Sequence, residues 1–325
     1  MKSIHSGIWP TMVTPFTKNK EIDYLAVEKL IDFYHQRGVA GIFAVCQSSE
    51  MFQLDLEEKK SLAKFIVQKV PDGMQVIVSG HTAEELDEQV REAEEIMCPG
   101  TDAYVILPNR FAAPDESDDV LIEKMEAFLR RFPDVPLGIY ECPYPYKRLL
   151  TPKVLRACAA SKRFLFIKDT CCSLEQIAEK LQIIKGSGIK LFNANSATLL
   201  ESLKLGADGY SGVMANFHPE LYAWLYHNFR SEPEKAEKLQ QFLGSGSLAE
   251  YQYYPVNAKY NLSLQGVPME ISSRVLEEEL FTESKRKEIA QLNELSAMIR
   301  GGLYGDEEKW KPIYDDAGLI RRNDV

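Results

Sequence analysis

Short apolar runs alternate with longer amphipathic stretches along most of the chain. Most of the short runs are apolar at consecutive positions, which is typical of strands in a parallel sheet that helices cover. These runs predict strands at residues 11–16, 39–46, 75–79, 103–107, 137–142, 164–168, 190–193 and 209–213. The amphipathic stretches predict helices at residues 24–36, 56–70, 83–97, 116–132, 152–160, 173–184, 197–205 and 219–230.

The alternation of these elements predicts the fold. Eight strand–helix units within about 230 residues are the pattern of a (β/α)8 TIM barrel, which is an α/β fold. A doubly wound open sheet, the rival architecture, normally carries a glycine-rich turn after its first strand. The chain reads Thr17-Lys18-Asn19-Lys20 at that point. We therefore favour the barrel and assign it to residues 1–230.

The remaining residues, 231–325, contain helical patterns without strand alternation. Helices are predicted at residues 233–242, 247–262 and 283–299, with a turn at Gly244-Ser245-Gly246 between the first two. We therefore expect a helical C-terminal extension that packs on the barrel rather than a second independent domain.

Composition excludes several classes of partner. The 325-residue chain has 38 lysines and arginines against 48 aspartates and glutamates, a net charge of −10, which argues against a general nucleic-acid binder. No run approaches the ~20 apolar residues of a membrane span, and residues 1–6 lack the apolar core of a secretion signal. The six cysteines are too sparse for a disulfide scaffold. We expect a cytoplasmic protein without a membrane partner.

The five histidines and six cysteines show no metal-binding spacing, since neither HExxH nor CxxC occurs. We therefore expect no metal site. The candidate chemistry comes instead from the carboxyl ends of the strands, where barrels of this type carry their active sites.

The apolar run at residues 164–168 ends with Lys168. Burial disfavours the charged form of a lysine and lowers its pKa, and the neutral amine can attack a carbonyl to form a Schiff base. The alternative is a lysine at the rim that pairs with Asp169. Position alone leaves both interpretations open.

Two other strand ends carry polar groups. Tyr140, in the run 137–142, is either a proton relay near the amine or a rim aromatic with a satisfied hydroxyl. After the run 39–46, Gln47 and Ser48 offer amide, hydroxyl and backbone N–H groups suited to a carboxylate. The alternative there is an ordinary polar turn in which Glu50 begins the next helix. Each signal is weak alone, and the order of all three points to a site.

The sequence resembles the N-acetylneuraminate lyase / dihydrodipicolinate synthase family of Schiff-base barrel enzymes. The resemblance covers about residues 8–217, and the helical extension also fits. Where the family has Gly-[Ser/Thr]-Thr-Gly-Glu, Tyr-Asn-x-Pro and Lys-[Asp/Glu]-[Ser/Thr], this chain has Cys46-Gln47-Ser48-Ser49-Glu50, Tyr140-Glu141-Cys142-Pro143 and Lys168-Asp169-Thr170. The other matching segments are Val13-Thr14-Pro15-Phe16, Gly38-Val39-Ala40-Gly41 and Leu205-Gly206-Ala207-Asp208-Gly209.

The resemblance implies class I aldolase chemistry on pyruvate or another 2-oxo acid, without metal or cofactor. Lys168 would attack the keto carbon, and Tyr140 would shuttle protons. Gln47 and Ser48 would hold the substrate carboxylate, and Gly212 would let the backbone approach the ligand closely. The family commonly forms tetramers built from dimers, so a homo-oligomer, dimer or tetramer, is implied.

Departures from the family concern the rest of the substrate. The dihydrodipicolinate synthases place an arginine where this chain has Pro145, and a tyrosine pair where it has Pro108-Asn109-Arg110-Phe111. Arg110 is either a binding group for a substrate anion or a solvated rim charge. The sialic acid lyases have an acidic pair where this chain has Asn195 and Ser196, which can still bond hydroxyl groups.

The physiological substrate therefore stays open. The chain is predicted to be a dihydrodipicolinate synthase-like lyase or aldolase, and the alternative is a sugar-acid aldolase similar to N-acetylneuraminate lyase. A third reading is a catalytically lapsed barrel that binds a 2-oxo acid as a regulator. It is motivated by the missing relay tyrosine and by Ser49, which replaces a glycine although serine tolerates positive φ poorly.

Overall fold

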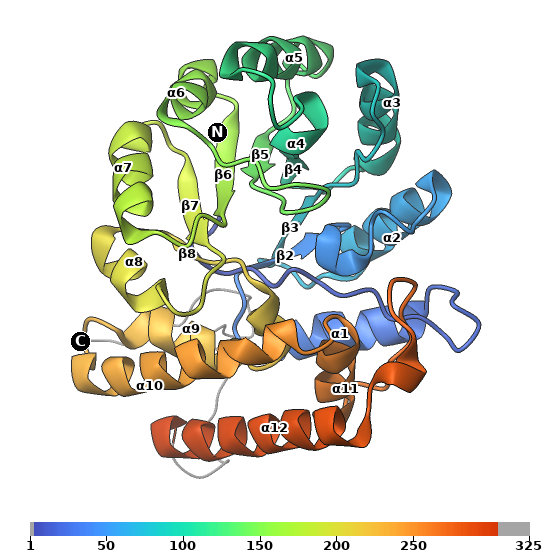
Figure 1. Ribbon diagram of the computed structural model, residues 1–325, viewed down its shortest axis with the longest axis vertical. Coiled ribbons are helices and arrows are strands. Elements are labelled where there is room, and N and C mark those ends of the chain that lie inside the picture. The colour runs from blue at the N-terminus through green and yellow to red at the C-terminus, as the bar shows by residue number, and fades with distance from the viewer. Residues whose placement is uncertain (1–2, 305–325) are drawn as a thin grey trace.

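The computed structural model describes residues 3–304 of the chain (Figure 1). Its strands form one parallel sheet in the order β1-β8-β7-β6-β5-β4-β3-β2. The strands are β1 (Gly7–Ile8), β2 (Gly41–Ala44), β3 (Gln75–Val78), β4 (Ala103–Ile106), β5 (Leu137–Tyr140), β6 (Phe164–Asp169), β7 (Lys190–Asn193) and β8 (Gly209–Tyr210). Consecutive strands from β2 to β8 are neighbours and β1 pairs with β8, as in a (β/α)8 barrel.

The segment after β1 closes the sheet against β2. The backbone N–H of Ala40 donates to Ile8 O at 2.9 Å, and that of Phe43 donates to Pro10 O at 3.0 Å. The predicted first strand at residues 11–16 is wrong in position, because the strand is Gly7–Ile8 and residues 11–16 hold only isolated bridges. Prolines at 10 and 15 have no N–H to donate, so a continuous ladder cannot form there.

Helices surround the barrel (Figure 1). They are α1 (Tyr24–Gln36), α2 (Leu56–Lys69), α3 (Leu86–Ile96), α4 (Pro108–Phe111), α5 (Asp118–Arg131), α6 (Pro152–Ser161), α7 (Leu174–Ile184), α8 (Leu199–Leu205) and α9 (Pro219–Asn228). All the helices predicted for the barrel are confirmed within a few residues, and α4 is an additional short helix. Local signals set several starts: Asp55 and Glu58 form a capping box on α2, and Thr151 caps α6 ahead of Pro152.

The extension consists of α10 (Pro233–Gly246), the 3₁₀ helix η3 (Ser247–Tyr251), α11 (Val256–Leu264), the 3₁₀ helix η4 (Glu278–Leu280) and α12 (Glu283–Tyr304). The turn predicted at residues 244–246 is wrong, because α10 continues through Gly246. A glycine costs a helix only about 1 kcal/mol, which packing against α9 and α12 offsets. The helix predicted at 247–262 is divided, since Pro255 precedes α11 and cannot donate inside a helix.

The predicted barrel with a helical extension is confirmed, and the division of the chain at residue 230 stays a prediction. The end of α9 at Asn228 and the start of α10 at Pro233 fall on either side of it. Residues 305–325 of the predicted extension lie outside the described part of the chain. Within residues 3–304, no helix is long and apolar enough to cross a membrane.

Aromatic side chains fill the barrel interior beneath the strand ends. Trp9 meets Phe166 edge to face, with ring centroids 5.6 Å apart, and Phe166 stacks on Phe192 at 4.5 Å. Phe43 meets the ring of Tyr140 edge to face at 5.7 Å. The interior is thus a packed core rather than a pore, so a ligand cannot pass through the barrel.

Candidate active site

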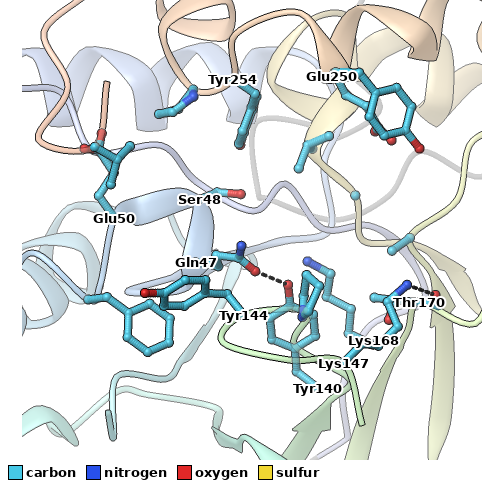
Figure 2. Close-up of a pocket in the computed structure, with 18 of the residues that line it drawn as sticks. Gln47, Ser48, Glu50, Tyr140, Tyr144, Lys147, Lys168, Thr170, Glu250 and Tyr254 are labelled. Atoms are coloured by element: carbon cyan, nitrogen blue, oxygen red, sulfur yellow. Dashed lines mark hydrogen bonds between the residues drawn. The ribbon is translucent and has the colours of Figure 1, made fainter. Parts of the chain in front are cut away.

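A cavity of about 840 Å³ lies at the carboxyl ends of the strands. Side chains from the strand ends form one wall, and residues of the extension form another (Figure 2). Six of the seven predicted site residues line it, and they come from five different strand ends. These are Gln47, Ser48, Tyr140, Lys168, Asn195 and Gly212.

Lys168 extends from β6 into this cavity, with a side chain only 3% exposed. Its Nζ lies 4.2 Å from the ring centroid of Tyr140 and 5.6 Å from that of Phe43. Burial lowers the pKa of the amine from 10.5 to about 8, so a substantial share is neutral near physiological pH. None of the ion pairs formed within residues 3–304 includes Lys168.

Asp169 does not pair with Lys168, so the alternative of a rim ion pair between them is wrong. Successive side chains of a strand point to opposite faces, and Asp169 points outward to Lys180 on α7. Lys180 also bonds Glu141, the residue after Tyr140. One buried lysine thus connects the two residues that directly follow Tyr140 and Lys168 in the chain.

Glu141, Asp169 and Lys180 form a buried cluster in which each charged group has a partner of opposite charge. Glu141 accepts hydrogen bonds from the backbone N–H of Leu150 at 2.8 Å and of Thr170 at 2.7 Å. Burial and the neighbouring Asp169 raise the pKa of Glu141, with Lys180 acting in the opposite direction. Burial alone would lower the pKa of Lys180, but the two carboxylates raise it. The cluster fixes the ends of β5 and β6 relative to each other.

Tyr140 places its phenol between Lys168 and the turn after β2. Its hydroxyl donates to Gln47 Oε1 at 3.3 Å (Figure 2). Burial raises the pKa of this phenol well above its usual value, so it stays protonated at physiological pH. The side-chain oxygen of Gln47 therefore orients a neutral hydroxyl beside the amine.

The turn after β2 is a 3₁₀ helix, η1 (Gln47–Ser49). The Ser48 hydroxyl donates to Thr11 Oγ1 at 3.0 Å, and the Ser49 hydroxyl donates to Met12 O at 2.7 Å. The left-handed conformation falls on Glu50, with φ of 60°, so Ser49 does not need positive φ. The alternative interpretation, in which Glu50 begins the next helix, is wrong, because α2 begins only at Leu56.

Glu50 connects this turn to the extension through a fully buried ion pair. Its carboxylate lies 2.7 Å from Nζ of Lys259 on α11 and also accepts from Ser273 Oγ at 3.0 Å and Arg274 N at 2.6 Å. The side chains of Glu50 and Lys259 are 1% and 0% exposed. Residues more than 200 positions apart in the sequence therefore hold the turn in place.

Gly212 and Asn195 follow β8 and β7 at the cavity wall. A Cβ on Gly212 would lie 2.2 Å from the Tyr210 hydroxyl and 2.6 Å from Ala194 O, so only glycine fits. The side-chain oxygen of Asn195 accepts from Thr198 N at 3.0 Å at the start of α8. This leaves the amide NH₂ of Asn195 as its donor group for a ligand.

Two other candidates lie away from the cavity lining. Ser196 is buried and shares hydrogen bonds with the hydroxyls of Tyr210, at 2.9 Å, and Tyr222, at 2.7 Å. Arg110 lies on α4 and is not among the described residues that line the cavity. The structure brings neither side chain to the other predicted site residues, and the binding role of Arg110 stays a prediction without support from this geometry.

No local pattern in the sequence indicates the wall that the extension contributes to the cavity. Glu250 and Tyr251 on η3, Tyr254, and the segment from Arg274 to Leu276 line the cavity. Tyr254 accepts from Asn216 Nδ2 at 3.3 Å. None of these residues stands in a motif, and only the fold brings them to the strand ends. Among residues 3–304, no group of three or more His, Cys, Asp or Glu side chains is placed to hold a metal ion.

A (β/α)8 barrel with a buried lysine beside a phenol at its strand ends is an arrangement suited to a Schiff-base lyase. The comparison with known families makes this specific: the chain belongs to the dihydrodipicolinate synthetase family, whose model matches residues 4–293. The match covers nearly the whole described part of the chain, extension included, and the predicted family is confirmed.

Relatives in this family carry the names of more than one reaction. A 4-hydroxy-tetrahydrodipicolinate synthase of Methanocaldococcus jannaschii is 27% identical over 81% of this chain and 89% of its own length. A probable 2-dehydro-3-deoxy-D-pentonate aldolase of Escherichia coli is 27% identical over 69% of this chain and 74% of its own length. An uncharacterized DapA-like lyase of Pyrococcus abyssi is 27% identical over 73% and 80%. Membership of this family therefore identifies the chain as a lyase, and the different names of its relatives leave the substrate open.

Solved structures show the same fold. A prophage protein of this family from Escherichia coli K12, in complex with pyruvate, superimposes with a TM-score of 0.80 at 23% identity. The match covers 92% of this chain and 99% of that one. A monomeric dihydrodipicolinate synthase variant superimposes with a TM-score of 0.82 at 20% identity, over 91% and 98%.

Proposed function

We propose that this lyase forms a Schiff base between Lys168 and pyruvate or another 2-oxo acid, and makes or breaks a carbon–carbon bond next to it. The observation that carries the proposal is the amine itself. It is buried, forms no ion pair within residues 3–304, and has its pKa lowered to about 8 by burial. Such an amine is nucleophilic near neutral pH.

The neighbouring groups suit the steps that imine formation requires. When Nζ attacks the keto carbon, the carbonyl oxygen must gain protons and leave as water, and the protonated phenol of Tyr140 lies beside the amine to supply one. Gln47 holds that phenol through its side-chain oxygen. The protonated imine then withdraws electrons from the adjacent carbon, which is how a covalent amine catalyst assists carbon–carbon cleavage.

The substrate carboxylate is assigned to the turn after β2. The amides of Gln47 and Ser48 begin the 3₁₀ helix η1, and amides in a first helical turn have no acceptor within the helix. Ser48, with its hydroxyl, and Gly212, with its bare backbone, line the same cavity. These groups favour a planar anion within reach of Lys168.

Reduction with borohydride in the presence of pyruvate tests the proposal. We expect mass spectrometry of the intact protein to show one reduced pyruvate adduct, and peptide mapping to locate it on Lys168. The other lysine that lines the cavity, Lys147, donates to Thr170 O at 2.9 Å and should stay unmodified. An adduct elsewhere, or none with any member of a panel of 2-oxo acids, contradicts the proposal, and binding without turnover favours a lapsed enzyme.

The pH dependence of adduct formation follows from the lowered pKa of Lys168. Below a pKa of about 8, the neutral fraction falls about tenfold for each pH unit, so the trapping rate at low pyruvate concentration should fall in proportion. Above that pKa the rate should level off. Trapping with cyanoborohydride at a series of pH values measures the midpoint. A midpoint near 10.5, the ordinary value for lysine, would contradict a buried reactive amine.

The proposal also covers the cellular compartment and the oligomeric state of the enzyme. The six cysteines are all free, which supports the reducing conditions of the cytoplasm. The family resemblance supports a homo-oligomer, dimer or tetramer, although a monomeric dihydrodipicolinate synthase variant has the same fold. The chemistry proposed here uses residues of one chain.

A further inference from the structure

We propose that Lys180 is a positioning residue for the reaction at Lys168: it holds the ends of β5 and β6 together, so that the phenol of Tyr140 stays beside the amine while the imine forms. This inference rests on the proposed function, since it concerns the geometry in which that reaction takes place. Lys180 is not among the described residues that line the cavity, so it acts through its neighbours and not on the substrate.

The two reactive side chains come from neighbouring strands in direct register. Tyr140 on β5 is the partner of Lys168 on β6, and the amine lies 4.2 Å from the centroid of the phenol ring (Figure 2). The residues that follow them, Glu141 and Asp169, meet Lys180 of α7 on the outer side of the sheet. Because inward and outward side chains belong to the same strand ends, a movement of the outer pair also moves the phenol relative to the amine.

On the outer side, two carboxylates share one cation. The side chains of Glu141 and Asp169 are fully buried, and Nζ of Lys180 bonds both of them. Burial and the charge of Asp169 raise the pKa of Glu141, as expected for two anions that lie close together away from water. Without Lys180, the remaining interaction between these two side chains is repulsion in a medium of low dielectric.

The need for this cation comes from a departure in the sequence. Where the family pattern has asparagine after the tyrosine, this chain has Glu141. An asparagine beside Asp169 would bring only one charge to the two strand ends. With Glu141 there are two like charges, and Lys180 on the adjacent helix supplies the compensating one.

Glu141 passes its position on to β6 through the backbone. Its carboxylate accepts from Thr170 N at 2.7 Å, and its main-chain oxygen accepts from Thr170 Oγ1 at 2.8 Å. Its own N–H donates to Lys168 O at 3.3 Å. A displacement of Glu141 therefore displaces the backbone of β6 at and after Lys168. Proton transfer requires hydrogen-bond reach between the reacting groups, so such a displacement slows the reaction.

The test measures how fast the imine forms, by mixing enzyme with pyruvate and quenching with borohydride after a series of short times. In Lys180→Met we expect the maximal rate to fall about 10- to 100-fold, the scale of a misplacement of about 1 Å. The pyruvate concentration that gives half the maximal rate should change little, because the turn assigned to the carboxylate belongs to β2. Adding Glu141→Gln to Lys180→Met removes one of the two like charges and should restore part of the rate.

Lys59→Met is the matched control for a purely structural effect. The side chain of Lys59 is also 3% exposed and pairs with Glu92, but it is not among the described residues that line the cavity. This variant should unfold at lower urea concentration and form the imine at the wild-type rate per folded molecule. If Lys180→Met behaves in the same way, with lower stability and an unchanged rate, the inference is overturned.

A further variant covers the case in which Lys180→Met does not fold. Glu141→Gln alone keeps the pair of Lys180 with Asp169 and weakens the link to β5. It should slow imine formation about tenfold, and a wild-type rate in this variant overturns the inference. The absence of any adduct in the wild-type protein would instead overturn the proposed function.

Discussion

Replacing Lys168 by methionine is expected to abolish the trapped pyruvate adduct and to lower turnover by roughly 10⁴- to 10⁶-fold, the scale on which a covalent mechanism loses its nucleophile. Methionine keeps much of the length and the apolar stem of the side chain but has no amine to attack a carbonyl. Steady-state assay of pyruvate condensation measures the rate, and mass spectrometry measures the adduct. An adduct that persists in Lys168→Met would place the nucleophile elsewhere.

The same substitution should leave the fold intact, which separates lost chemistry from lost structure. Each pKa unit corresponds to about 1.4 kcal/mol, so holding the amine where its pKa is about 8 instead of 10.5 costs the folded protein about 3 kcal/mol at neutral pH. We therefore expect the free energy of unfolding to rise in Lys168→Met. Lys147→Met is the matched control in the same cavity, and it should retain the adduct.

Replacing Lys259 by methionine is expected to lower the free energy of unfolding by about 3–5 kcal/mol, because it leaves the Glu50 carboxylate buried without its cation. Ser273 and Arg274 still donate to that carboxylate, but neither side chain hydroxyl nor backbone amide replaces the charge. Urea unfolding measures the loss. Pyruvate should also bind more weakly, since Glu50 directly follows the turn Gln47–Ser49.

A second variant shows whether the unpaired charge of Glu50 causes the lower free energy of unfolding. The double variant Glu50→Gln, Lys259→Met removes both charges and should recover part of the lost stability. Lys287→Met in α12 removes an exposed ion pair with Glu283 and should leave the urea midpoint nearly unchanged. If Lys259→Met unfolds at the wild-type urea concentration, the buried pair does not hold the extension to the turn.

The barrel was predictable because its strands are buried on both faces and therefore read as continuous apolar runs. The prediction failed where backbone hydrogen bonding, and not burial, decides the element. Residues 11–16 are almost as apolar as a strand, yet Pro10 and Pro15 leave them without a ladder. At Gly246, the helix continues because tertiary contacts outweigh a weak local preference.

The candidate site was predictable to the extent that it lies at strand ends. Lys168, Tyr140 and Gln47 each end or follow an apolar run, and the fold alone brings them into one cavity. Glu250 and Lys259 have no such signal, because they belong to helices of the extension, and the partner of Lys259 lies 209 positions away along the chain. Asp169 pairs with Lys180 rather than with Lys168, and no local pattern in the sequence indicates Lys180 as its partner.

The wall that the extension contributes has a consequence for how the protein is made. A ribosome that has synthesised the barrel strands has already placed Lys168 and Tyr140 in the nascent chain, but the cavity also needs residues up to Leu276. Until those residues emerge, the wall of the cavity that lies across from Lys168 does not exist. The reactive lysine therefore acquires its enclosed surroundings late in synthesis, after most of the polypeptide is in place.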